Sequence, residues 1–141
     1  MLKTYSIKEV AQKFDLSIST IRYYDKRGLL PFVAKNKSGY RVFTETDLNL
    51  IKTVVCLKNT GMAIKNIQKY IQLVMQGPDS IEQRKQLLEL HKQQVIQKQK
   101  LLSENLQEIN FKINKYNSKN AKEVIKTELA YVLAEKKELK L

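Results

Sequence analysis

Six apolar residues spaced by seven positions constrain the fold of this chain more than any other feature. The uninterrupted row is Ile81, Leu88, Val95, Leu102, Ile109 and Tyr116. No Gly or Pro lies between Asp79 and Tyr116, so the pattern predicts one long helix with a narrow apolar stripe. Such a helix is poorly stabilised alone in water, whereas two of them form a coiled coil. We therefore expect residues 79–116 to be a dimerisation helix.

The companion row, four residues further on, is Lys85, Lys92, Gln99, Leu106 and Ile113, apolar only in its second half. A half-polar seam favours an antiparallel pair, in which each helix also packs on other parts of its partner. The alternative is a monomer whose helix folds back on itself, which the lack of Gly and Pro disfavours. After a break at residues 117–120, residues 121–141 predict a C-terminal helical tail, either docked on the dimer or frayed.

A shorter helix is predicted from Ser17 to about Arg27. Ser17 suits the N-cap position, because its hydroxyl accepts a hydrogen bond from a backbone N–H at the helix start, and Gly28 suits the end. One face, which must be buried, carries Ile18, Ile21 and Tyr24. The opposite face carries hydroxyls, a guanidinium and an amine, from Ser19, Arg22, Tyr23 and Lys26. Such donors suit phosphate oxygens and base edges of DNA, so this is a candidate recognition helix.

A preceding helix is predicted to begin at Ser6, which forms a capping-box pattern with Glu9. Its apolar stripe is Ile7, Val10, Ala11 and Phe14. Two helices joined by a short break at residues 15–16 are typical of the helix-turn-helix unit, whose second helix enters the major groove. From this segment alone, a generic pair of antiparallel helices remains an alternative.

Residues 29–43 predict a β-hairpin, or wing, beside the second helix. The residue before Pro31 is pushed out of the helical region, so residues 29–33 should be extended. Residues 36–39 form a turn cluster and residues 40–43 a short strand. Cations near the tip would meet the DNA backbone, unless the hairpin is merely solvated; they are Lys35, Lys37 and Arg41. Two more helices are expected, at 44–59 and 63–75.

Three segments together resemble the MerR family of bacterial transcription regulators. They are YSIKEVA at residues 5–11, TIRYYDKRGLLP at 20–31 and GYRVF at 39–43. The resemblance covers residues 3–76 closely and the coiled-coil segment more loosely. It implies a mainly α protein: a winged helix-turn-helix DNA-binding domain at 3–76, the antiparallel coiled-coil dimerisation helix at 79–116 and a helical tail at 121–141.

The resemblance also implies a function. The residues that would contact the operator are Ser17, Ser19, Arg22, Tyr23 and Tyr24 from the recognition helix, with Tyr40 and Arg41 holding phosphates from the wing. A dimer would read a palindromic promoter site. The family resemblance further implies activation by DNA distortion, in which a promoter with an over-long spacer is bent and untwisted until RNA polymerase engages both elements.

The charge distribution favours a polyanionic partner. The chain of 141 residues has a net charge of +12. Residues 1–44 hold nine Lys or Arg against three Asp or Glu, a net charge of +6, so the charge density there is about twice that of the remaining 97 residues. No run approaches the ~18 apolar residues of a membrane span, and no signal peptide is evident. We expect a bacterial cytoplasmic, nucleoid-associated protein.

The candidate sensor is Cys56. A single cysteine excludes an internal disulfide and a multi-thiolate metal site, so we expect neither metal nor cofactor. Cys56 falls beside Asn49, Lys52 and Thr53, off the apolar arc of its helix, and Lys52 would favour the reactive thiolate. Alternatively, Cys56 fills space against the partner's long helix. Its surroundings, VCLKNTG, resemble a short single-cysteine subgroup of the family thought to sense aldehydes, quinones or nitrosative stress.

Three other functions remain open at this point. A regulator of the same family could be switched by a small ligand at the dimer junction. A non-switching architectural protein would share every feature but show no effector response. A coiled-coil interaction protein would lack salt-dependent, sequence-selective DNA binding. An enzyme is not expected, because the chain has one histidine, no cofactor loop and no cluster of acid–base residues.

Overall fold

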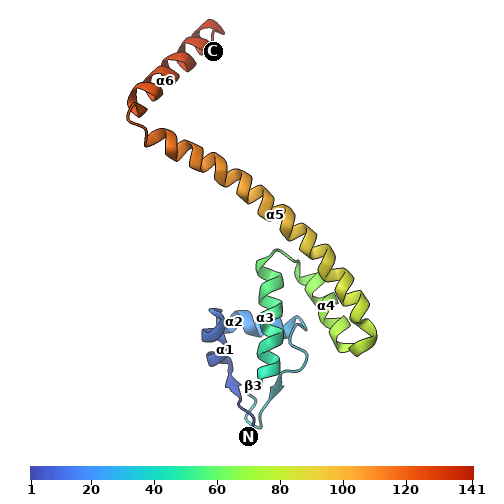
Figure 1. The fold of residues 1–141 in the computed structure, drawn as a ribbon. Helices are drawn as coiled ribbons and strands as arrows, with labels where there is room; N and C mark the ends of the chain where they lie inside the picture. The colour runs from blue at the N-terminus through green and yellow to red at the C-terminus, as the bar shows by residue number, and fades with distance from the viewer. The chain divides into compact units, whose positions relative to one another are not determined.

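The computed structural model describes all 141 residues, and most of them are helical (Figure 1). The helices are α1 (Ile7–Phe14), α2 (Ile18–Lys26), α3 (Glu45–Asn59), α4 (Ile64–Met75), α5 (Ile81–Tyr116) and α6 (Ala121–Glu138), with a 3-10 turn, η1 (Gly77–Ser80), before α5. The strands are β1 (Tyr5–Ser6), β2 (Ala34–Lys35) and β3 (Arg41–Phe43). The predicted fold class is confirmed. No helix combines the length and apolar character needed to cross a membrane.

Two compact units divide the chain, Met1–Val95 and Ile96–Leu141. The division falls inside α5, because its first turns pack on the helices before it: Leu87 and Leu88 lie against the core. The sequence analysis instead places the boundary at residues 76–79, between the end of one helix and the start of the next. That boundary separates a DNA-binding part from a dimerisation part, and this division by function remains a proposal.

The hydrophobic core lies in the first unit. Its fully buried side chains come from the four helices α1 to α4, from β3 and from the turn after α2, and include Val10, Ile21, Leu29, Phe43, Ile51, Val54, Ile67 and Ile71. The helix starts follow the predicted capping chemistry. Ser6 Oγ accepts from the Glu9 N–H at 3.1 Å, and Ser17 Oγ accepts from the Thr20 N–H at 3.0 Å. Local polar chemistry therefore sets where α1 and α2 begin, and apolar spacing sets which faces they bury.

The sheet has three antiparallel strands in the order β1-β3-β2. The β2–β3 hairpin was predicted, but β1 was not, because its two residues were assigned to the start of the first helix. The predicted extended stretch at 29–33 is wrong in part. The Val33 N–H bonds the Leu30 carbonyl at 3.3 Å, which closes a turn with Pro31 at its second position, and pairing starts only at Ala34.

The α4–α5 corner is closed by polar groups. Ser80 is fully buried, and its hydroxyl lies 2.8 Å from the Gly77 carbonyl and also bonds the Leu73 carbonyl. Arg84 Nε donates to Ser80 Oγ at 2.9 Å, and Arg84 Nη2 donates to the Val74 carbonyl at 3.1 Å. The Leu73 and Val74 carbonyls lie at the C-terminal end of α4, where a helix lacks further N–H partners and a cation is favourable, and the Gly77 carbonyl lies just beyond it in η1. The corner thus joins the start of α5 to the end of α4.

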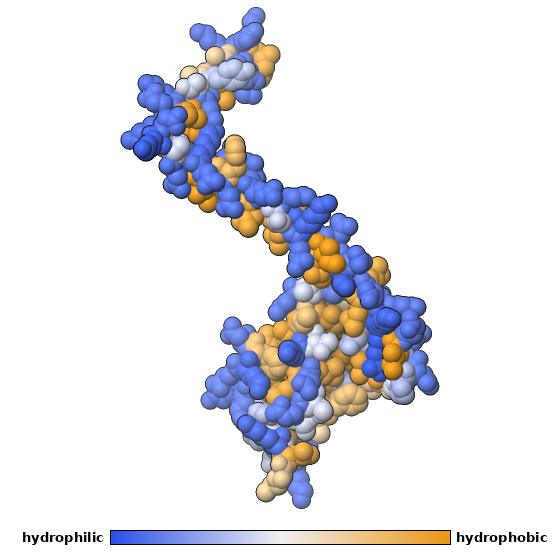
Figure 2. Space-filling model, viewed as in Figure 1, coloured by the Kyte–Doolittle hydropathy of each residue, from blue (hydrophilic) through white to orange (hydrophobic).

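No side chain after His91 is buried. The sevenfold row is solvent-exposed over the second half of α5, where Leu102 is 70% and Ile109 55% exposed. Figure 2 shows apolar side chains at the surface along the helices of this part of the chain. Within the second unit, Lys115 pairs with Glu128 of α6. A single chain therefore leaves its longest apolar stripe uncovered.

Replacing Ser80 by alanine should lower the free energy of unfolding by about 1–3 kcal/mol, because Arg84 and the end of α4 lose a buried hydrogen-bonding partner. Urea denaturation at one fixed protein concentration measures the change. Ser103→Ala, on the exposed surface of α5, is the matched control and should stay within about 0.5 kcal/mol of the parent. Equal effects of the two substitutions would contradict a special role for the corner.

Candidate nucleic-acid interface

The outer face of α2 carries the predicted recognition residues. Ser17, Ser19, Arg22 and Tyr23 are all exposed, and Tyr23 is 48% exposed. At the N-terminus of the helix, Ser17 Oγ lies 3.0 Å from Ser19 Oγ and 2.7 Å from Thr20 Oγ1. A hydroxyl cluster at the positive end of a helix dipole suits an anionic oxygen. The structure thus brings these four residues together on one surface.

Tyr24 differs from its neighbour. It is 5% exposed and belongs to the core cluster that contains Ile21 and Leu29, because its position three residues after Ile21 turns it inward. Burial raises the pKa of the Tyr24 phenol, with a smaller contribution from Tyr23, so the group stays neutral near pH 7. The two rings lie with centroids 6.3 Å apart. This burial supports a packing role for Tyr24, and its contact with the operator stays a prediction.

The wing is joined to the recognition helix by an ion pair. Arg41 Nε donates to Asp25 Oδ2 at 2.7 Å, and the two side chains are 22% and 26% exposed. A pair so open to solvent contributes at most about 1 kcal/mol to stability, so its main effect is on orientation. The guanidinium has five N–H donors, and this bond uses one. Tyr40, beside it, is 72% exposed, whereas Arg41 is partly buried by its contact with Asp25.

Sequence reasoning missed the partners that hold this surface in place. Asp25 pairs with a residue 16 positions away, and Gln68 Nε2 donates to the Arg27 carbonyl from 41 positions away, at 2.7 Å. Tyr5 donates a hydrogen bond to Glu45, which is the main cause of its raised pKa, followed by burial. No local pattern marks such pairs, because each depends on the folded arrangement of separate elements.

Cys56 is exposed on α3, as the helical wheel predicted. Its carbonyl accepts two hydrogen bonds from Thr60, from the N–H at 3.1 Å and from the hydroxyl at 2.8 Å. The Thr60 hydroxyl also lies 2.7 Å from His91 Nε2 on α5. The candidate sensor thus lies one helical turn from the residue that contacts α5. No group of three His, Cys, Asp or Glu side chains has the arrangement of a metal site.

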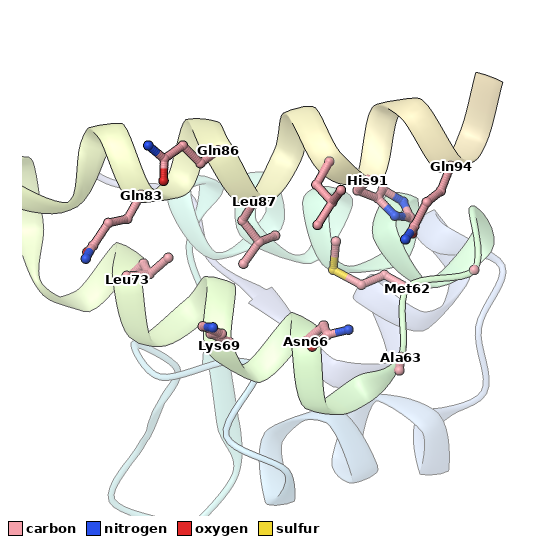
Figure 3. Close-up of a pocket in the computed structure, with 12 residues that line it drawn as sticks. Met62, Ala63, Asn66, Lys69, Leu73, Gln83, Gln86, Leu87, His91 and Gln94 are labelled. Atoms are coloured by element: carbon pink, nitrogen blue, oxygen red, sulfur yellow. The ribbon is translucent and has the colours of Figure 1, made fainter. Parts of the chain in front are cut away.

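A groove of about 590 Å³ lies between α4 and the first turns of α5 (Figure 3). Its apolar lining comes from Met62, Leu73, Leu87 and Leu90. Figure 3 shows Leu87 and Met62 directed into the space between the helices, with His91 beside them. Amide side chains of Asn66, Gln83, Gln86 and Gln94 add polar groups, and no carboxylate lines the groove. The groove could take a small amphipathic molecule.

A second groove, of about 530 Å³, involves a different set of α5 side chains. The first two members of the sevenfold row, Ile81 and Leu88, line it together with Tyr70 of α4. Lys85 and Lys92, the first two members of the companion row, line it too. The predicted coiled-coil seam therefore continues into a groove against α4.

An exposed recognition helix, a bracing helix before it and a wing beside it define a winged helix-turn-helix DNA-binding protein. The model of the MerR HTH family regulatory proteins matches residues 5–73. An uncharacterized HTH-type transcriptional regulator of Haemophilus influenzae is 43% identical over 86 residues, 61% of this chain and 64% of that protein. The regulator AdhR of Bacillus subtilis is 35% identical over 92 residues, 65% of this chain and 66% of that protein. The matches span just under two thirds of these relatives.

Solved structures agree over a longer stretch. HiNmlR, a MerR family regulator lacking the sensor domain and bound to promoter DNA, superposes with a TM-score of 0.76 at 37% identity, covering 81% of this chain and 90% of that chain. A MerR family regulator from Bacillus thuringiensis gives 0.75 at 41% identity, covering 81% of this chain and all of that chain. This chain belongs to the MerR family of DNA-binding transcription regulators, and its relatives are regulators rather than enzymes.

The two adjacent tyrosines allow a direct test of the interface. Tyr24→Ala should lower the free energy of unfolding by about 3–5 kcal/mol, because it leaves a cavity in the core. Tyr23→Ala should change it by no more than about 0.5 kcal/mol, because the ring is half exposed, while weakening binding to a promoter fragment. Thermal or urea unfolding and fluorescence anisotropy measure the two effects. A large loss of stability in Tyr23→Ala would refute the division of roles.

Proposed function

We propose that this protein is a homodimeric regulator that binds a palindromic promoter site and acts by distorting the DNA. The observation that carries the proposal is the Arg41–Asp25 pair, which holds the wing and the recognition helix in one orientation. Ser17, Ser19, Arg22 and Tyr23 would then meet the major groove while Tyr40 and Arg41 meet phosphates on its flank. Rigid alignment of both elements is what reading a deformed duplex requires.

The exposed stripe of α5 supports the dimer. Large apolar side chains exposed along one helix face mark an interaction surface, and the sevenfold row is the pattern of a coiled-coil seam. The seam ends in the groove beside Tyr70, which supports an antiparallel partner whose helix reaches the first unit. In this proposal residues 3–76 bind DNA, residues 79–116 dimerise and residues 121–141 form a tail of unassigned role.

The mode of action follows from dimer geometry. Two recognition helices at a fixed separation bind two half-sites only if the DNA between them adopts a matching bend and twist, and the energy of that deformation depends on the sequence between them. HiNmlR, of similar fold, was solved on promoter DNA, which supports promoter DNA as the target here. RNA polymerase is the partner that would use the distorted promoter. This binding would take place in the bacterial cytoplasm, at the nucleoid.

Arg22→Ala should weaken binding to the promoter fragment by about fivefold or more, because a guanidinium contact with a base edge is worth about 1–3 kcal/mol. Titrations at several salt concentrations show whether Arg22 contacts a phosphate or a base. A phosphate contact would lower the salt slope by about one and weaken all sequences alike, whereas a base contact would relax specificity. Lys137→Ala, on exposed α6, removes the same charge as a control. Equal affinities of the two variants would contradict a recognition role for α2.

The switch in this proposal is Cys56. Its side chain is exposed on α3 and is the only thiol of the chain, so thiol-selective electrophiles have one target. Adding a group there would change how α3 packs on neighbouring elements. The subgroup resemblance around this residue points to aldehydes, quinones or nitrosative agents as the reactive class.

Cys56→Ser should abolish the response of promoter distortion to formaldehyde and to benzoquinone, while leaving DNA affinity without electrophile unchanged. Footprinting of the promoter spacer, with and without each electrophile, measures distortion, and a reporter gene measures the response in cells. Mass spectrometry of the parent protein should show an adduct on the peptide that contains Cys56, and the same peptide of Cys56→Ser should lack it. A response that persists in Cys56→Ser would eliminate the thiol switch.

The groove between α4 and α5 supports a second candidate, a small ligand as the inducer. A response that survives Cys56→Ser and is lost in Leu90→Trp would favour this ligand, because Leu90 is 66% exposed and a larger side chain there narrows the groove without disturbing the core. A protein that responds to no effector in either background would be a non-switching architectural DNA-binding protein.

A further inference from the structure

His91 is the last buried side chain of the chain and the point at which α5 leaves the DNA-binding body. It is 8% exposed, and its Nε2 lies 2.7 Å from the hydroxyl of Thr60, the C-cap residue of α3. The two residues are 31 positions apart, so this contact joins α5 directly to the helix that carries Cys56. None of the DNA-facing residues takes part in it.

The Thr60 hydroxyl lies within hydrogen-bonding distance of groups on two helices. Besides His91 Nε2, they are two carbonyls of its own helix, that of Cys56 at 2.8 Å and that of Leu57 at 3.2 Å. A hydroxyl has one hydrogen to donate and an oxygen that accepts, so it can bond the end of α3 and His91 at the same time. The tautomer of the imidazole ring sets which of Thr60 and His91 is the donor.

The bond is the second of two polar anchors for α5. The first is Arg84, which bonds Ser80 and the end of α4. His91 follows seven residues later, which places it about 10 Å further along the helix axis. Two separated anchors define the direction of a rigid rod across a surface, whereas one anchor with apolar packing lets the rod pivot.

We propose that Thr60 and His91 form a positioning pair that sets the angle of α5 against the DNA-binding body. In the dimer this angle determines the separation and tilt of the two recognition helices, so this inference rests on the proposed homodimer. The pair also defines a short route from Cys56 to α5, because the Thr60 N–H bonds the Cys56 carbonyl at 3.1 Å and the Thr60 hydroxyl lies 2.8 Å from the same carbonyl. A shift of the α3 turn that begins at Cys56 moves the anchor of α5.

The test compares Thr60→Val, which removes the hydroxyl at nearly constant shape, with Thr60→Ser, which keeps it. Both are made in the full chain with Cys56→Ser and with Lys37→Cys as a spin-label site in the exposed turn of the wing. Pulsed electron resonance then measures the distance between the two wings of a dimer. Thr60→Ser should keep the parent's narrow distribution, and Thr60→Val should broaden or shift it. His91→Leu should act like Thr60→Val.

A second readout uses promoter fragments whose half-site spacing is lengthened or shortened by one base pair. Thr60→Val should reduce the discrimination between parent and altered spacing by about threefold or more, the range expected for loss of one hydrogen bond. Circular dichroism checks that each variant is folded. If Thr60→Val folds and keeps both the parent distance distribution and the parent discrimination, the positioning role is refuted.

The experiment separates this inference from the proposed function. A parent chain that is monomeric by light scattering, with no interspin distance, would overturn the homodimer and the inference together. A parent dimer with one narrow distance and a Thr60→Val dimer that matches it would overturn the positioning pair alone. A parent dimer with a broadened Thr60→Val distribution, restored in Thr60→Ser, would establish it.

Discussion

The last carbonyl groups of α4 lack the N–H partners that a longer helix would supply, and side chains from beyond the helix bond them. Ser80 of η1 bonds the Leu73 carbonyl, and Arg84 of α5 bonds the Val74 carbonyl. Because these donors stand just before α5 and in its first turn, the bonds that cap α4 also fix where α5 begins. The apolar face of α5 then falls on the core through Leu87 and Leu88. One cluster of hydrogen bonds within the chain therefore positions the start of α5 without the help of a partner helix.

On the DNA-facing side, too, polar side chains of one element bond groups of another. Asp25 directs Arg41, and Gln68 caps the end of α2 through the Arg27 carbonyl. Each bond is modest in energy, because each lies partly in solvent. Together they restrict how the wing and α4 sit against the recognition helix, and restriction of orientation matters more for a DNA reader than the energy of any one pair.

Residues whose partners are close in sequence were predictable, and residues whose partners are distant were not. Ser6 and Ser17 signalled the starts of α1 and α2 because a cap bonds its own helix. The exposure of Cys56 followed from helical periodicity. Strand β1, the Asp25–Arg41 pair and the Thr60–His91 contact depend on chain segments that meet only in the fold. Tyr24 fitted both the apolar face of its helix and the set of predicted DNA contacts, and its burial in the structure supports the first.

The opposite burial of Tyr23 and Tyr24 has an evolutionary consequence. In the proposed interface, changes at the exposed Tyr23 alter which DNA sequence the protein binds and leave its folding intact, so operator preference can drift there at little cost in stability. Changes at the buried position act on the core first, and few alternatives fill the same volume. Neighbouring codons in the same helix are thus under unrelated selection pressures. New regulatory specificities in a lineage carrying this helix should arise at the outward position while the inward ring persists.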